Sequence, residues 1–419
     1  MAEAAAQATG RDTLWRHREF LKLWTAQTIS VFGDNFTGLA LPIIAAISLQ
    51  ATPGQMGVLT AVERAPFLIL GLFAGVWVDR MRRRPILIVG DIGRGLVLLS
   101  IPLAALSASL GMSQLYLDGA LIGILTVFFD VSYQAYLPSL VERRQLVEGN
   151  SKLEATRSIA QLAGPGIAGA VIQILTAPIA IILDAVSFLI SALLIGSIRR
   201  PEEPPDAQGR RALLAEAREG LGVVFGSPYL RSIAGATGTS NLFASSLFTL
   251  YILFVTRELG LTPAAIGLIF SIANVAGLLG ALTAGRLAAR FGLGRVIIGS
   301  MFIGGLGFVP VGLATPVTAY PLLILAAALA SFGVPVYNIN QVSLRQAITP
   351  MRLQGRMNAT MRFLVWGTMP LGGLLGGALG EAFGLRPAIL ISAAGGALAF
   401  LWVLLSPVRA LQTIPDHAD

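Results

Sequence analysis

Acidic side chains that interrupt apolar segments are the residues of this chain with the clearest chemical potential. Asp34 follows Gly33 and precedes Asn35 in an apolar run that begins near residue 20. At a rise of 1.5 Å per residue, about 14 residues place Asp34 roughly 20 Å along a helix. A carboxylate at the centre of a bilayer costs about 2.5 kcal/mol or more, so its presence calls for a reason. We predict that Asp34 and Asn35 form a site for a proton or a cationic substrate; the alternative is a structural hydrogen bond from Asp34 to a neighbouring helix.

Further charges fall inside apolar segments. Glu63 and Arg64 are adjacent in sequence, and adjacent positions on a helix do not face each other, so each needs its own partner. We predict Glu63 as an outer gate or second protonation site, or, as the favoured alternative, a member of an interhelical ion pair. Asp91 and Arg94 are three residues apart and are expected to form a structural pair along one helix face.

Two other acids receive no role at this stage. Asp118 and Asp184 are expected toward the outer ends of their helices, where water reaches them. We therefore assign neither of them to the site.

Helices that cross a membrane must position these charges. Of the 419 residues, 55% are hydrophobic and 12% are charged, against about 25% charged residues in an ordinary globular chain. This composition argues against a soluble enzyme and against a nucleic-acid-binding chain, despite the net charge of +8. Each crossing needs about 20 apolar residues. We predict an all-α polytopic membrane protein with twelve crossings, at residues 20–48, 55–79, 85–107, 113–138, 153–176, 178–198, 230–256, 263–289, 294–315, 317–342, 358–380 and 386–406.

Arginines are distributed unequally between the two sides of this predicted bundle. Cytoplasmic connections of membrane proteins are enriched in Lys and Arg. Among the connections near the crossings, Arg257 and Arg386 fall on one side, and the other arginines cluster on the opposite side: Arg80, Arg82, Arg83, Arg84, Arg143, Arg144, Arg199, Arg200, Arg210, Arg211, Arg290, Arg295, Arg345, Arg352 and Arg356. We predict cytoplasmic N- and C-termini and a multi-pass protein of the bacterial cytoplasmic (inner) membrane.

The long polar interval after residue 198 divides the crossings into two sets of six. The two sets resemble each other, since Gly75 and Arg80 have counterparts in Gly285 and Arg290. Two related six-helix halves are typical of carriers that work by alternating access. The predicted organisation is a tail at 1–19, a six-helix bundle at 20–198, a linker with an amphipathic helix at 199–229, a second bundle at 230–406 and a tail at 407–419.

The connection after the second crossing resembles the loop signature of the major facilitator superfamily, Gly-x-x-x-Asp-Arg-x-Gly-Arg-Arg/Lys. Arg82 stands where the family has glycine, and the matching residues are Gly75, Asp79, Arg80, Arg83 and Arg84. Gly75 would permit close helix packing. The resemblance implies a cluster that latches the outward-facing state. We expect four further residues near the cytoplasmic ends of the helices to belong to the same latching cluster, which we call the inner network: Asp130, Glu154, Arg157 and Arg362.

A stretch of the fifth crossing is similar to the signature of the superfamily's antiporters, Gly-x-x-x-Gly-Pro-x-x-Gly-Gly. Gly164, Pro165 and Gly169 match, whereas Ala160 and Ala168 replace two glycines. The match implies export. Equally, small residues and a proline suit a close-packed interface without any transport meaning.

Longer stretches resemble the branch of macrolide-efflux proteins and siderophore (enterobactin) exporters. They are residues 128–138, 146–154, 183–189 and 355–362. The resemblance implies proton-coupled efflux of bulky amphipathic small molecules. Two alternatives stay open: a lipid or lysolipid flippase of the same fold, and a non-transporting membrane sensor.

The second half of the chain offers amide and aromatic groups instead of acids within its crossings. Such a mixture suits a large, partly hydrophobic ligand, but membrane amides also join helices. The cavity candidates are Asn241, Asn274, Tyr337, Asn338, Asn340, Gln341 and Trp366.

The chain has no cysteine and two histidines, and it lacks a phosphate-binding loop. We therefore expect no enzyme activity, no metal and no cofactor, and the proton gradient is the expected energy source. The expected partners are protons, the lipid bilayer and an amphipathic small molecule, with no nucleic acid, and the protein is expected to be a monomer.

Overall fold

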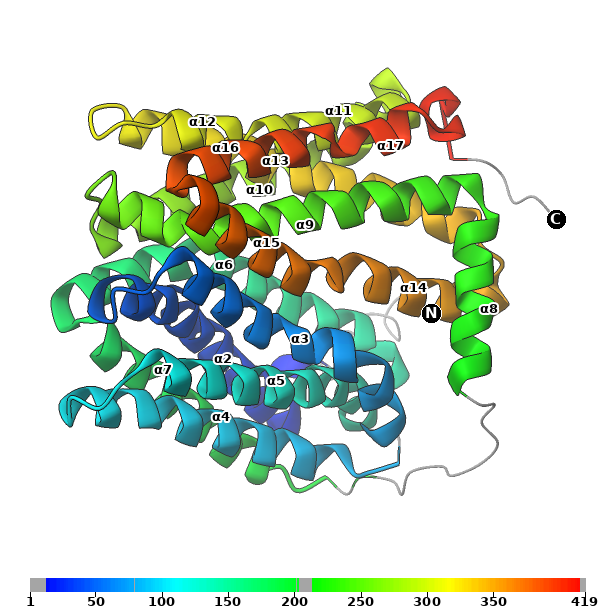
Figure 1. Ribbon diagram of the computed structural model, residues 1–419. Helices are drawn as coiled ribbons and strands as arrows, with labels where there is room; N and C mark the ends of the chain where they lie inside the picture. Colours follow the sequence, from blue (N-terminus) through cyan, green and yellow to red (C-terminus); the bar gives the residue numbers. More distant parts are fainter. Residues whose placement is uncertain (1–12, 79, 201, 203–212, 415–419) are drawn as a thin grey trace. The chain divides into compact units, whose positions relative to one another are not determined.

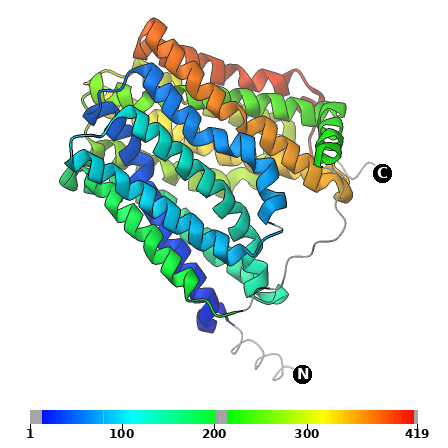
Figure 2. The same cartoon turned by 60° about the horizontal axis from the view of Figure 1, so that its bottom comes forward.

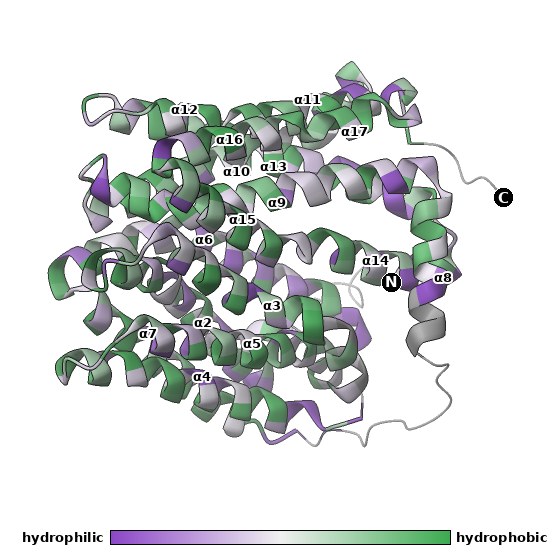
Figure 3. Cartoon of the chain, viewed as in Figure 1, coloured by the Kyte–Doolittle hydropathy of each residue, from purple (hydrophilic) through white to green (hydrophobic). Residues whose placement is uncertain are grey.

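The computed structural model describes residues 13–78, 80–200, 202 and 213–414, and within these ranges it contains helices and no strand (Figure 1). Eleven helical segments there are long and apolar enough to cross a membrane. Another long helix, α3 (Pro53–Val78), lies between the first and second of them in sequence and carries Glu63 and Arg64. Apolar residues cover most of the length of these helices (Figure 3). The predicted all-α membrane fold is confirmed.

Each predicted crossing corresponds to a helix or to consecutive helices. Two begin about seven residues earlier than predicted, at Leu146 and Met351, because their polar first turns continue the helix beyond the apolar run. The other elements are η1 (Leu14–Arg16), α2 (Arg18–Ile43), η2 (Ile44–Ser48), α4 (Arg83–Leu106), α5 (Met112–Leu140), η3 (Arg143–Gln145), α6 (Leu146–Leu175), α7 (Ala177–Gly196), α8 (Leu213–Gly226), α9 (Pro228–Arg257), α10 (Pro263–Phe291), α11 (Leu293–Leu306), α12 (Val309–Leu313), α13 (Ala319–Ala347), α14 (Met351–Trp366), α15 (Thr368–Phe383), α16 (Leu385–Ala397), η4 (Leu398–Phe400), α17 (Leu401–Leu404) and η5 (Pro407–Ala410).

Contacts divide the chain into two compact units. Unit 1 comprises Met1–Leu41 and Ile69–Gln208, and unit 2 comprises Pro42–Leu68 and Gly209–Asp419. The division cuts through α2 and α3, so the end of α2 and the first part of α3 pack with unit 2. The boundaries of this division therefore lie inside two helices as well as in the long connection.

In unit 1, α4 lies side by side with α7 and with α5 (Figures 1 and 2). Large buried side chains such as Phe20, Leu87, Phe129 and Tyr136 form its core near the predicted cytoplasmic end. This packing fixes the three helices on which most of the buried charges of the chain are found.

In unit 2, the first part of α3 packs against α15 at very short range. A Cβ atom added to Gly57 would come within 2.9 Å of the Cα atom of Gly377, so only glycine fits there. The backbone N–H of Gly54 donates to Glu381 over 3.0 Å, and Thr249 of α9 donates to Thr60 over 3.1 Å. These contacts explain why this part of α3 belongs to unit 2.

The predicted linker helix exists as α8, and it lies across the ends of α9 and α14 (Figure 1). Glu219 forms an ion pair with Arg356 of α14 at 2.6 Å, and Val224 is fully buried in the core of unit 2. Gly220 contacts the backbone of Arg356 and the side chain of Thr360. The helix is therefore packed on unit 2 along its second half rather than surrounded by solvent.

Candidate functional site

One face of α2 approaches α7 closely because it carries a glycine. A Cβ atom at Gly33 would collide with the side chains of Asp184 and Ser187. One turn later, the Thr37 hydroxyl donates a short hydrogen bond to Asp184. The Ser187 hydroxyl donates to the other carboxylate oxygen of Asp184 over 3.0 Å. Two hydroxyl donors thus hold the carboxylate of Asp184, a residue that is 1% exposed.

Asp34 projects from the adjacent direction of the same helix, because successive residues of an α-helix are turned by about 100°. Arg94 of α4, Asp130 of α5 and Arg157 of α6 lie within electrostatic range of its carboxylate, and so does Asp184. The Asp34 side chain is exposed, but its charged surroundings come from unit 1 itself. The carboxylate therefore faces the polar interior of unit 1.

Arg94 is the fixed cation of this interior. Its guanidinium group lies 4.1 Å from the centres of both the Phe129 and the Phe188 rings, in a cation–π sandwich. It also forms an ion pair with Asp91 at 2.5 Å, and Ser191 donates to Asp91 over 2.6 Å. Arg94 is 3% exposed and Asp91 is fully buried. The predicted Asp91–Arg94 pair is present along one face of α4.

The charges around Arg94 do not cancel. Asp91 pairs with Arg94 directly. The other charges in the same region are Arg157 and the carboxylates of Asp34, Asp130 and Asp184, so carboxylates outnumber arginines there. Uncompensated charge is costly where water is excluded. Binding of a proton or another cation removes this excess. Among the residues that the structure describes, no group of three or more His, Cys, Asp or Glu residues could hold a metal ion.

The expectation that water reaches Asp118 and Asp184 is wrong, since these residues are 5% and 1% exposed. Asp118 accepts a hydrogen bond from Ser100 over 3.0 Å, just as Asp184 accepts two from its neighbours. Distance from the end of a helix says nothing about which face the residue occupies, and both acids face other helices. Gly33 was the available signal for Asp184, because a glycine beside Asp34 indicates a close helix.

Asn35 of α2 packs against Gly164 of the antiporter-like motif in α6. The Asn35 side chain occupies the space beside Gly164 of α6, where a Cβ atom would collide with it. The Asn35 amide donates to the Val31 carbonyl over 2.8 Å. The helix continues through Pro165, and Gly169 is buried. The motif thus holds α2 against α6 and sets the orientation of the neighbouring Asp34.

Glu63 is half-buried on α3 and belongs to unit 2, whereas Asp34 belongs to unit 1. The interhelical ion pair expected for Glu63 and Arg64 is not found within the described part of the chain. Adjacent helix positions point in different directions, and neither side chain meets an opposite charge on another described helix. Arg64 is nevertheless close enough to Glu63 to act on it electrostatically.

The loop signature is only partly visible, because Asp79 lies outside the described residues. Arg83 and Arg84 donate their backbone N–H groups to Glu202 over 2.7 and 3.1 Å. The Arg84 side chain donates to the carbonyls of Ile195 and Gly196 at the end of α7. Glu202 is not among the residues predicted from the sequence for this cluster.

Within the described residues, Gly75 has no close packing partner and the Arg80 side chain has no hydrogen bond or ion pair. Space is open around Gly75, where close packing was expected. Arg80 is exposed.

The inner network residues fall into two places. Asp130, Glu154 and Arg157 all act electrostatically on Tyr133, so these three surround one buried phenol of α5. Arg362 belongs to unit 2, where its guanidinium group lies 5.0 Å from the Trp366 ring centre.

Several polar residues of unit 2 join helices. Asn241 donates to the Val365 carbonyl over 3.0 Å, and Tyr337 shares a 2.7 Å hydrogen bond with Thr237. Asn340 donates to the Val336 carbonyl over 2.8 Å within its own helix.

The remaining cavity candidates differ in how exposed they are. Gln341 is buried and donates weakly to the exposed Asn338 over 3.5 Å. Asn274 is half-buried. Trp366 is 43% exposed and contacts Phe67 edge-on at 6.1 Å. Trp366 and Asn338 are thus the most accessible of the predicted cavity residues.

Comparison with known proteins gives one family and several similar proteins. The model of a family described as "Transmembrane secretion effector" matches residues 13–418. The multidrug efflux pump Tap of Mycolicibacterium fortuitum is 28% identical over 85% of this chain and 88% of its own length. The enterobactin exporter EntS of Escherichia coli O81 (strain ED1a) is 26% identical over 96% of this chain and 95% of its own length.

Solved transporter structures share the fold. A bacterial homologue of the iron transporter ferroportin, in an inward-facing state, gives a TM-score of 0.76 at 18% identity, covering 94% of this chain and 99% of that one. The nucleoside transporter NupG gives a TM-score of 0.72 at 13% identity, covering 92% of this chain and 98% of that one.

Proposed function

Because the chain belongs to the transmembrane secretion effector family of the major facilitator superfamily, we propose that it exports bulky amphipathic small molecules in exchange for protons. Drugs and siderophore-like compounds are the proposed substrates, since the similar proteins include a multidrug efflux pump and an enterobactin exporter. Transport proceeds by alternating access in the bacterial cytoplasmic membrane, with both termini in the cytoplasm. The arginine distribution supports this orientation.

The excess of carboxylates over arginines beside α2 carries the proposal. Asp34 and Asp184 share one region with the already paired Arg94. Loading one proton there removes a charge that the low dielectric disfavours, and releasing it restores the charge. This change is a source of free energy that a carrier can couple to movement between its states.

Asp34 is the acid that takes the proton in this proposal. Two hydroxyl groups donate to Asp184 and hold its carboxyl group in place. Within the described residues no such donor reaches Asp34, although its side chain is exposed. An accessible carboxylate without donors exchanges protons more readily than a buried one with two. Asp184 acts as a positioning residue that joins α7 to α2 beside Asp34.

Transport by purified protein in liposomes under an imposed pH gradient tests the proposal, with fluorescent dyes, macrolides and labelled lysolipids as probes. We expect Asp34→Asn to abolish gradient-driven movement, because an amide cannot take up the proton. Asp118→Asn is the matched control: it changes another buried acid to an amide, and it should leave transport near the unmodified level.

Gradient-driven transport by Asp34→Asn at the unmodified rate would show that Asp34 does not couple the proton. Movement of lysolipids alone, with dyes and macrolides left in place, would favour the lipid flippase instead of the drug exporter.

A further inference from the structure

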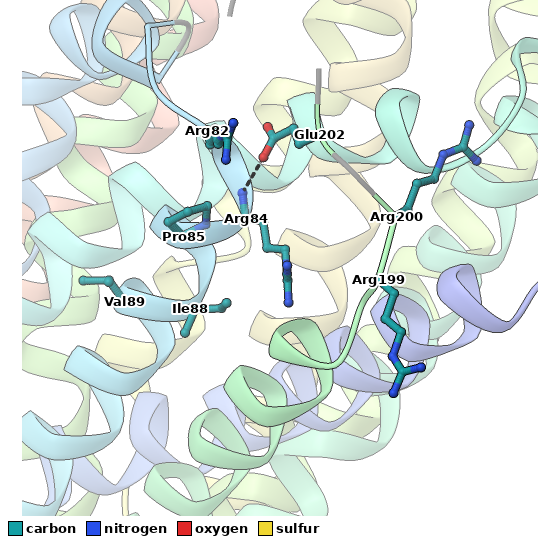
Figure 4. A pocket seen from close by; sticks show the side chains of 8 residues that line it. All are labelled: Arg82, Arg84, Pro85, Ile88, Val89, Arg199, Arg200 and Glu202. Carbon is teal, nitrogen blue, oxygen red and sulfur yellow. Dashed lines mark hydrogen bonds between the residues drawn. The ribbon is translucent and has the colours of Figure 1, made fainter. Parts of the chain in front are cut away.

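A basic pocket opens in unit 1 where α4 begins and α7 ends (Figure 4). Its volume is about 520 Å³. Four arginines and one glutamate line it together with three apolar residues of α4: Arg82, Arg84, Arg199, Arg200, Glu202, Pro85, Ile88 and Val89. Four positive charges against one negative charge leave the pocket strongly cationic.

Two of the four arginines are already used by the protein. Arg84 donates to the carbonyls of Ile195 and Gly196, which ties the start of α4 to the end of α7. Arg200 donates to the Leu140 carbonyl at the end of α5. Glu202 accepts hydrogen bonds from two backbone N–H groups in the first turn of α4, so its charge is directed at the start of that helix. These contacts build the walls of the pocket.

The other two arginines are available for a ligand. The side chains of Arg82 and Arg199 are exposed, and in the described ranges no hydrogen bond or ion pair engages their guanidinium groups. They come from different segments of the chain and line the same pocket (Figure 4). Figure 4 shows the two side chains on opposite sides of the pocket, where each guanidinium group can donate charge-assisted hydrogen bonds to an anionic group.

An apolar surface continues from the pocket along the helices. Val89, Leu96 and Leu103 are 63%, 59% and 65% exposed, and a spacing of seven residues places them on one face of α4. Leu193, near the end of the adjacent α7, is 74% exposed. A ligand with a phosphate in the pocket can therefore lay a hydrocarbon chain along α4.

We propose that this pocket binds the headgroup of an anionic phospholipid of the cytoplasmic leaflet, with its phosphate among the arginines of the pocket and an acyl chain lying over Val89. The proposal goes beyond the export function and does not depend on it. Its position follows from the arginine-rich side of the protein, which the positive-inside rule assigns to the cytoplasm. Basic residues near the cytoplasmic surface of a membrane attract anionic lipids.

Native mass spectrometry of the delipidated full-length protein, titrated with phosphatidylglycerol or with phosphatidylcholine of the same acyl chains, tests the site. We expect one phosphatidylglycerol to bind preferentially. The double variant Arg82→Gln/Arg199→Gln should weaken its apparent Kd by roughly tenfold or more, because two arginine contacts are lost. Val89→Asn should weaken phosphatidylglycerol binding too, by removing part of the acyl contact.

The matched control is Arg143→Gln/Arg144→Gln, which removes two exposed arginines of η3 in the same unit. This control should bind phosphatidylglycerol like the unmodified protein. Equally weakened phosphatidylglycerol binding in both double variants would show that only the overall surface charge matters, and it would overturn the proposed site. Displacement of the lipid by millimolar inorganic phosphate would also overturn it, because the pocket would then select the phosphate alone. Size-exclusion profiles identify any variant that fails to fold.

Discussion

The immediate partners of three acids of unit 1 set them apart from one another. Asp91 faces a guanidinium group, Asp184 faces two hydroxyl donors, and Asp34 faces charges without a donor of its own in the described structure. The same carboxylate group therefore serves as one half of an ion pair, as a fixed acceptor or, in our proposal, as an accessible proton site. Residue type alone does not distinguish these roles.

Removal of Asp91 should strongly destabilise the protein. Asp91→Ala leaves the Arg94 guanidinium group buried without its counter-ion, and breaking a buried pair in this way costs about 3 to 5 kcal/mol. Thermal unfolding in detergent should show a markedly lower Tm. Glu142→Ala, which breaks the exposed Glu142–Arg144 pair, is the control and should change stability by about 1 kcal/mol or less. Equal melting temperatures for the two variants would contradict the structural role of Asp91.

At the scale of elements, α2 connects the site to its surroundings. Gly33 and Thr37 face α7, Asn35 faces Gly164 of α6, and Asp34 lies between these two directions. Close approach on both sides fixes the rotation of α2 about its axis, and this rotation determines where the Asp34 carboxylate points.

A side chain at Gly33 should therefore impair transport by displacing α2 from α7. Gly33→Val places methyl groups where Asp184 and Ser187 now lie, and such overpacking costs about 1 to 3 kcal/mol. Gly38→Val is the control on the same helix, because nothing lies within 4 Å of the corresponding Cβ position. We expect slow liposome transport and a lower Tm for Gly33→Val alone. Similar behaviour of the two variants would show that the α2–α7 contact is not needed.

At the scale of the whole molecule, the apolar helices and the placement of the arginines determine different properties. Hydropathy decides which segments enter the bilayer, whereas the arginine-rich connections decide which side faces the cytoplasm. The absence of cysteine from the sequence makes this orientation directly measurable.

Single cysteines should report the orientation in intact cells. Ser109→Cys and Val317→Cys lie in exposed connections of the arginine-poor side and should react with a membrane-impermeant maleimide from outside. Arg143→Cys and Met351→Cys, exposed on the arginine-rich side, should react only after the cells are opened. The opposite labelling pattern would invert the proposed topology and with it the leaflet of the proposed lipid site.

Much of the fold and part of the site could be predicted. The crossings follow from long apolar runs, and the Asp91–Arg94 pair follows from a spacing of three on one helix. Asp184 could not be ranked, because its importance depends on contact with a helix about 150 residues away in the chain. Glu202 was not predicted as a site residue for the same reason, since it is far in sequence from the start of α4 that it contacts.

The sequence by itself determined that this chain is a helical membrane protein, where its helices run, and that Asp34 requires an explanation. These conclusions depend on hydropathy and charge, and both can be evaluated within short segments of the chain. Only the tertiary structure decided that Asp184 lies against α2, that two aromatic rings enclose Arg94, and that Arg82 and Arg199 share a pocket. Such contacts depend on which helix faces meet, and packing between distant segments, not local composition, selects those faces.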